Sequence, residues 1–158
     1  MKSFISLSAV IAVMMGVTAT MASSPAGQLS APLELKVSQA GFAGITGTVT
    51  TIEPDGGYRV STFVNEMVRP PESEGRLPPE ALQAIVRSLE AQDFSRLPDE
   101  MGEPPPVNAK TVTLRYGDRS AAMVLEPGAD LPAAAAASGP ESRFAAIVQS
   151  VTRAVDAP

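Results

Sequence analysis

The residues of this chain that could do chemistry are carboxylates and isolated bases, because its 158 residues include no histidine and no cysteine. The chain therefore has no Ser-His-Asp or Cys-His nucleophile system and no disulfide. It also lacks the usual ligands of structural zinc and copper sites and the histidine that commonly holds haem. We expect no metal and no cofactor.

Two groups of carboxylates remain as candidates for acid–base chemistry: Glu53 with Asp55, and Asp99 with Glu100 and Glu103. A glycosidase needs two carboxylates that face each other across a sugar-sized cleft. A thin domain of this size offers little cleft, and the second group lacks the spacing of a calcium loop. We therefore interpret both groups as solvated loop charges and predict no catalytic residues, keeping an enzyme with a carboxylate-only site as a third hypothesis.

The glycine-rich stretch "SQAGFAGITG" (Ser38–Gly47) is the most unusual segment, with glycines at 41, 44 and 47. It lacks the Gly-Lys-Ser/Thr end and the following helix of a phosphate loop. The Gly-x-x-Gly loop of KH domains lies beside a basic surface, whereas this chain is acidic. The glycines are explained by a tight turn between the first two strands, which uses backbone angles that other residues resist.

Phe42 is the residue of this stretch that a turn does not require. In one interpretation the loop folds back and Phe42 caps the end of the sheet. In the other, Phe42 is an exposed aromatic side chain that enters a pocket of a partner. On the second interpretation the partner-binding residues are Gly41, Phe42, Ala43 and Gly44.

Five strands are predicted from alternating or β-branched residues, with hairpin turns at Asp55-Gly56 and Gly117-Asp118. Two charged, proline-rich segments, Glu66–Pro79 and Pro98–Pro106, are predicted to be loops. The strands are expected at Leu33–Ser38, Thr48–Glu53, Tyr58–Val64, Thr111–Tyr116 and Ala121–Glu126.

Two helices are predicted. The first starts at Pro78-Pro79 and has an apolar stripe at helical spacing, and the second has a capping box from Ser138 to Glu141. The stripes consist of Leu82, Ile85, Val86 and Leu89, and of Phe144, Ile147, Val148, Val151 and Val155. The order β-β-β-α-β-β-α predicts an α+β fold, with a single antiparallel sheet of four to five strands and both helices on one face. Pro127–Gly139 is compatible with a loop or a short helical turn.

The start of the chain is typical of a signal peptide, with Lys2, an apolar run from Phe4 to Val17 and small residues up to Ala22. The expected organisation is a signal peptide at 1–22, a flexible lead-in at 23–32 and one domain at 33–156. We predict a periplasmic or secreted protein without stable membrane insertion after signal removal. A net charge of −5 argues against nucleic acid as a partner.

The order of motifs resembles the emfourin family, small bacterial inhibitors of thermolysin-like metalloproteases. The resemblance rests on "GFAG", on "LPPEALQAIVRSLEAQDFSRLP" and on "NAKTVTLRYGDRS", and it extends from Leu33 to about Leu125. It implies an exported metalloprotease as the partner and the Gly41–Gly44 end as the contact region. The sequence thus predicts a small exported non-enzymatic binding domain, with a structural or accessory envelope protein as the alternative.

Overall fold

A computed structural model describes residues 28–42, 44–103, 107–125, 129, 131 and 138–157. The predicted signal peptide, Ala43 and most of the undecided segment Pro127–Gly139 lie outside these residues. Among the described residues, eight strands form one open sheet in the order β4-β3-β2-β1-β7-β8-β6, and β5 pairs with β3 beside β4. The strands are β1 (Leu33–Gly41), β2 (Gly44–Ile52), β3 (Gly57–Val64), β4 (Met67–Val68), β5 (Ser73–Arg76), β6 (Glu100–Met101), β7 (Lys110–Tyr116) and β8 (Arg119–Leu125).

The α+β class is confirmed, but the prediction of four to five antiparallel strands is wrong in detail. The five long strands β3, β2, β1, β7 and β8 are antiparallel neighbours, as expected. Three short strands arise within the segments that were predicted to be loops, and β6 runs parallel to β8, so the sheet is mixed. These short strands satisfy backbone hydrogen-bonding groups of β3 and β8 that would otherwise form open sheet edges.

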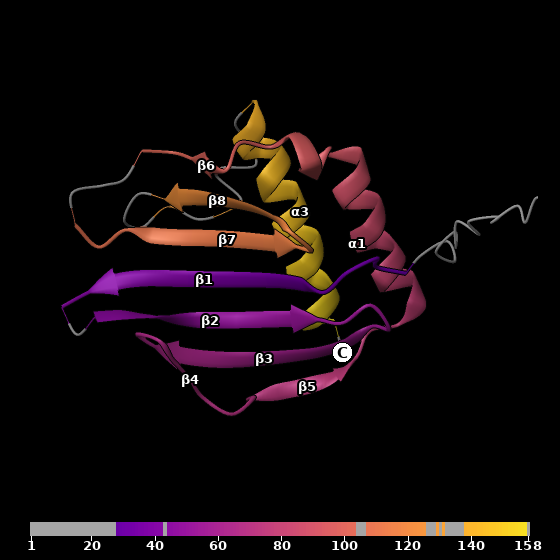
Figure 1. Ribbon diagram of the computed structural model, residues 1–158, viewed down its shortest axis with the longest axis horizontal. Coiled ribbons are helices and arrows are strands. Elements are labelled where there is room, and N and C mark those ends of the chain that lie inside the picture. Colours follow the sequence, from indigo (N-terminus) through magenta and orange to yellow (C-terminus); the bar gives the residue numbers. More distant parts are fainter. Residues whose placement is uncertain are drawn as a thin grey trace, which may run out of the picture.

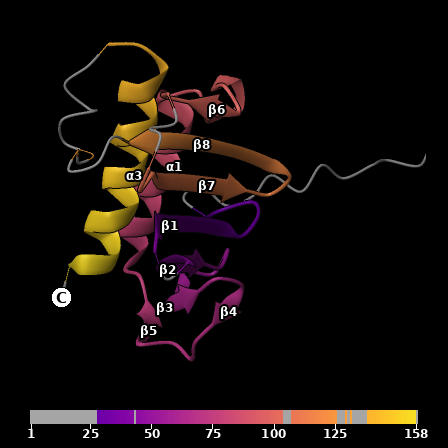
Figure 2. The same ribbon diagram turned by 90° about the vertical axis from the view of Figure 1, so that its left-hand side faces the viewer.

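Two helices, α1 (Pro79–Ala91) and α3 (Pro140–Asp156), lie on the same side of the sheet (Figures 1 and 2). The predicted apolar stripes face the core, since most of their side chains are buried. The buried ones are Leu82, Ile85 and Leu89 of α1 and Phe144, Ile147, Val148 and Val151 of α3. Val86 and Val155, which were predicted with them, are partly buried against this core. A short 3₁₀ helix, η1 (Phe94–Arg96), follows α1. The predicted capping box is wrong, because the N-cap of α3 is Gly139 and no side chain caps this helix.

The core lies between the sheet and the two helices. Alternate residues of β1, β7 and β8 face the helices, and the most deeply buried side chains include Leu33, Leu114 and Phe144. Leu29 also belongs to this core, and the hydroxyl of Ser30 is 2.7 Å from that of Tyr116. The packed region therefore begins before the predicted domain start at residue 33.

One large side chain, that of Phe63, is also buried on the opposite, open face of the sheet, which no helix of the described residues covers. Phe63 of β3 is only 3% exposed although it does not belong to the main core. The Nζ atom of Lys36 lies 4.6 Å from the centroid of its ring, an arrangement typical of a cation–π contact. Phe63 pairs with Gly47 of β2, which leaves the space beside the ring free of a side chain. Near the glycine-rich segment, the open face of the β1–β2–β3 half of the sheet is therefore covered at Phe63, whereas Thr46 and Thr48 of β2 are exposed.

Candidate partner-binding site

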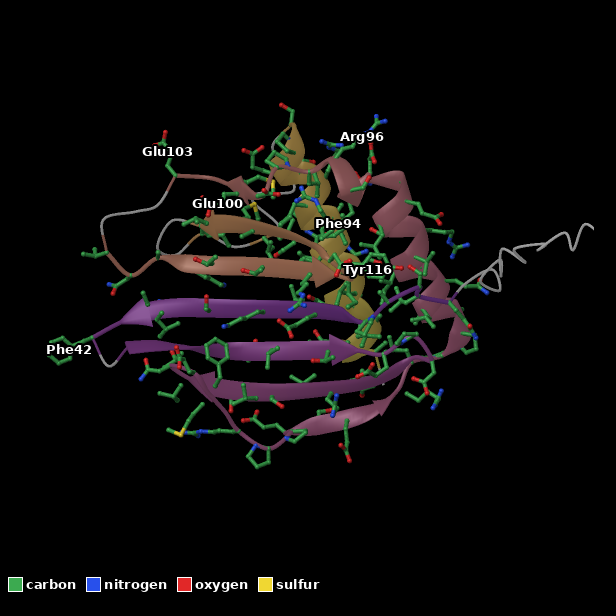
Figure 3. The ribbon with its side chains drawn as sticks, in the orientation of Figure 1. Phe42, Phe94, Arg96, Glu100, Glu103 and Tyr116 are labelled. Carbon is green, nitrogen blue, oxygen red and sulfur yellow. The ribbon has the colours of Figure 1, made fainter. Side chains whose placement is uncertain are left out.

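The glycine-rich segment forms the tip of a hairpin, and it continues the sheet instead of interrupting it. β1 and β2 pair along their whole length, and Gly41 and Gly44 form the last pair. Phe42 follows Gly41 in the turn, and Ala43 lies outside the described residues. The ring of Phe42 projects from the tip away from every strand (Figure 3). Its relative exposure of 111% means that no described residue covers it.

Asn65 holds the β2 side of this tip from the turn that follows β3. The side-chain Oδ1 atom of Asn65 accepts a hydrogen bond of 3.0 Å from the backbone amide of Ile45. The backbone amide of Asn65 donates one of 2.6 Å to the carbonyl of Ile45. Asn65 adopts a left-handed backbone conformation with φ of 57°, which asparagine tolerates better than most residues. The reciprocal hydrogen bonds join the hairpin tip to the β3–β4 turn.

Gly44 is required by this arrangement. Its φ of 107° is one that side-chain-bearing residues rarely adopt, and a Cβ atom there would lie 2.2 Å from Oδ1 of Asn65. Gly47 has a different role, because a Cβ atom there would lie 1.9 Å from the carbonyl oxygen of Val37 on the neighbouring strand. Two of the three glycines thus permit close approach between segments.

The β1 side of the tip is held by the segment that leads into β7. The amide of Ala40 donates a hydrogen bond of 2.9 Å to the carbonyl of Ala109. Neighbouring segments therefore fix both strands of the hairpin within a few residues of Phe42. A fixed tip presents its side chain without a large cost in conformational entropy when it binds.

The candidate carboxylates do not face one another across an enclosed cleft. Glu53 pairs with Arg59 at 3.2 Å, Asp55 pairs with Arg76 at 2.7 Å, and Asp99 pairs with Arg119. Glu100 and Glu103 are exposed, and they lie beyond β8 at the edge of the sheet (Figure 3). Within the described part of the chain, no group of three or more acidic residues is placed to hold a metal ion.

The pKa of Asp55 is lowered by its hydrogen bonds. A hydrogen bond from the backbone amide of Gly57, and then one from Arg76, hold the pKa of Asp55 below its ordinary value of 3.8. Such a group is ionised at neutral pH and would not serve as a general acid. It lines an open hollow of about 600 Å³ together with Glu53 and Glu74, where the arginine pairs neutralise two of the three charges.

The sequence did not predict several exposed residues that lie near the β1–β2 tip. Besides Phe42, the large apolar side chains exposed in the described part of the chain are Ile45, Met67, Val68 and Val107. Met67 and Val68 fall in a segment that was predicted to be a loop. Asn65 also went unnoticed, although an asparagine directly after a strand is a signal for a left-handed turn residue.

No protein-family model matches this chain, and no curated protein matches it. The described helices include none that is long and apolar enough to cross a membrane.

Proposed function

We propose that the mature chain is a small exported binding domain without enzymatic activity, and that it inserts Phe42 into an apolar pocket of a partner protein. We further propose that the partner is a thermolysin-like metalloprotease, which the domain inhibits. The observation that carries the proposal is the full exposure of Phe42 on a hairpin tip that is fixed on both sides. Exposure of an aromatic ring to water is unfavourable in free energy, and its burial in a partner's pocket is a common source of binding energy.

The choice of partner is supported by the resemblance to the emfourin family, because the "GFAG" of this chain at the tip is one of the motifs that carry the resemblance. The absence of histidine and cysteine and the arginine pairing of the carboxylates favour binding over catalysis. Export is supported by the sequence pattern of residues 1–22.

The test is to titrate the mature protein against thermolysin and to compare Phe42→Ala with Gln39→Ala. Gln39 is also exposed and lies on β1 close to the tip, so it is a matched control. Removal of an anchor costs about 2 kcal/mol or more, which corresponds to roughly a thirtyfold weaker inhibition. The control should inhibit like the wild type. Absence of inhibition by the wild-type protein at micromolar excess contradicts the metalloprotease as partner.

A further inference from the structure

The large apolar side chains that are exposed in the described part of the chain all lie at one end of the sheet. Phe42 and Ile45 belong to the β1–β2 tip, Met67 and Val68 to β4, and Val107 to the segment before β7. We call these five residues the apolar end. They come from three segments that are far apart in the sequence, so their gathering is a property of the fold.

Hydrogen bonds connect these three segments. Asn65 joins the β3–β4 turn to Ile45, and the carbonyl of Ala109 accepts from the amide of Ala40. The apolar end is thus carried by segments that are held to one another at the same edge of the molecule.

Phe42 alone is too small to make a stable interface. A phenylalanine side chain buries about 150–250 Å². A standard interface buries roughly 800 Å² on each partner, which corresponds to a patch about 30 Å across. The apolar end spans β4, β3, β2, β1 and β7, and at about 4.8 Å between strands this is roughly 20 Å. The whole end therefore covers about two thirds of that width, whereas the ring of Phe42 alone covers far less.

Charge and shape define the kind of partner. No charged residue occurs between Lys36 and Glu53, and the charged residues beside Met67, Val68 and Val107 carry both signs. A strongly charged partner surface would find no complementary field here. Two protruding tips cannot enclose each other's rings, so a second copy of this chain is a poor match. A protein with an apolar pocket surrounded by an uncharged rim matches both features.

We propose that the apolar end is a single interaction surface, in which Phe42 fills the pocket of such a partner and Ile45, Met67, Val68 and Val107 cover its rim. This inference rests on the function proposed above and extends the contact region from the hairpin tip to three segments. It requires that side chains on β4 and before β7 contribute to affinity although they lie outside the glycine-rich stretch.

The experiment measures the dissociation constant of the complex with thermolysin for Met67→Glu, Val107→Glu and Ser120→Glu. All three positions are exposed, and Ser120 lies at the opposite end of the long strands, so each variant is expected to fold. A buried unpaired charge at the rim should weaken binding about tenfold or more for Met67→Glu and Val107→Glu. Ser120→Glu should bind like the wild type. Binding of the wild type should change less than about twofold between about 0.05 M and 0.5 M salt.

The outcomes separate this inference from the proposed function. If Phe42→Ala loses binding while Met67→Glu and Val107→Glu keep it, the hairpin function stands and the wider surface is overturned. The same conclusion follows if Ser120→Glu weakens binding as much as the two rim variants do, since an added negative charge then weakens binding wherever it is placed.

If wild-type protein does not bind thermolysin, the metalloprotease proposal fails, and photo-crosslinking in the exported protein fraction decides the wider surface. A photoreactive residue at Met67 or at Val107 should capture the same protein as one at Phe42, and one at Ser120 should not. Capture of different proteins, or of none, overturns the inference.

Discussion

Asn65 links the turn after β3 to the hairpin tip by two hydrogen bonds with Ile45. We predict that Asn65→Gly loosens the β2 side of the tip, where the backbone hydrogen bond to the Ile45 carbonyl remains, and that Asn65→Asp does not. Glycine keeps the left-handed backbone but removes the acceptor, whereas aspartate keeps an acceptor and also tolerates this conformation. A lost hydrogen bond of about 1.4 kcal/mol corresponds to roughly tenfold faster exchange of the Ile45 amide. Amide exchange followed by NMR measures this, and equal exchange in the two variants contradicts the prediction.

At the scale of single residues, the sequence indicates that Phe42 is not needed for the turn, but it does not decide where the ring lies. Its direction depends on how far β1 and β2 extend beyond the helices, and that distance is fixed by pairing along the whole hairpin. The role of Gly47 is hidden for the same reason. The carbonyl of Val37, on the neighbouring strand, leaves no space for a side chain at Gly47, and the local sequence carries no signal of this.

At the scale of elements, Asp55 connects the β2–β3 turn to β5. Because its pKa in the folded protein is lowered, its contribution to stability is present above the ordinary carboxyl pKa and is lost as the pH falls through the folded value. We predict that wild type and Asp55→Asn differ in urea midpoint by a constant amount near neutral pH, and that the difference shrinks below about pH 4.

The control for the Asp55→Asn variant is Asp118→Asn, which removes a carboxylate at another exposed turn. The difference between the wild type and Asp55→Asn should also shrink in high salt, because Asp55 and Arg76 are both exposed and their attraction is screened. A difference that grows toward acidic pH would contradict the assigned direction of the pKa shift.

Helix α1 offers a comparison between two buried positions of equal side-chain volume. Ile85 is fully buried, whereas Leu89 borders a hollow of about 240 Å³ beside Phe94. Truncation leaves a larger unrelaxed cavity where the surroundings are closed. We therefore predict that Ile85→Ala costs close to 5 kcal/mol and Leu89→Ala closer to 2 kcal/mol, the two ends of the usual range. Urea unfolding measures both, with the exposed Arg87→Ala as a control near zero.

An Ile85→Ala variant as stable as the wild type would mean that α1 is not packed as described. Equal costs at the two positions would mean that the hollow beside Leu89 is filled in solution.

Helices α1 and α3 and strands β1, β7 and β8 could be predicted because each has one apolar face with the period of its element, whereas β2 is predicted from its β-branched residues. The short strands β4, β5 and β6 could not be predicted, since every residue of β4 and β5 is exposed and these strands follow no apolar pattern. They form because β3 and β8 have backbone groups to satisfy, with hydrogen bonds such as those from Arg69 to Thr62 and from Glu72 to Val60. These backbone groups need hydrogen-bond partners at the sheet edges only once the sheet is assembled.

At the scale of the whole molecule, stability and the proposed binding function reside in different places. The helices and the core cover one side of the sheet, and the β1–β2 tip with Phe42 projects from the strand ends (Figures 1 and 3). A surface that projects beyond the core can keep apolar side chains in water for a partner without weakening the fold. Residues of the apolar end should therefore be replaceable at little cost in stability.

Two phenylalanines test this separation directly, because they have the same side chain and opposite burial. Phe42 is fully exposed and Phe144 is fully buried in the core. We predict that Phe42→Ala changes the free energy of unfolding by no more than about 0.5 kcal/mol, whereas Phe144→Ala costs about 3–5 kcal/mol. Urea unfolding of the two variants and the wild type gives the comparison. A large loss of stability in Phe42→Ala would show that the ring packs against the protein in solution, and it would remove the basis for its role as an anchor.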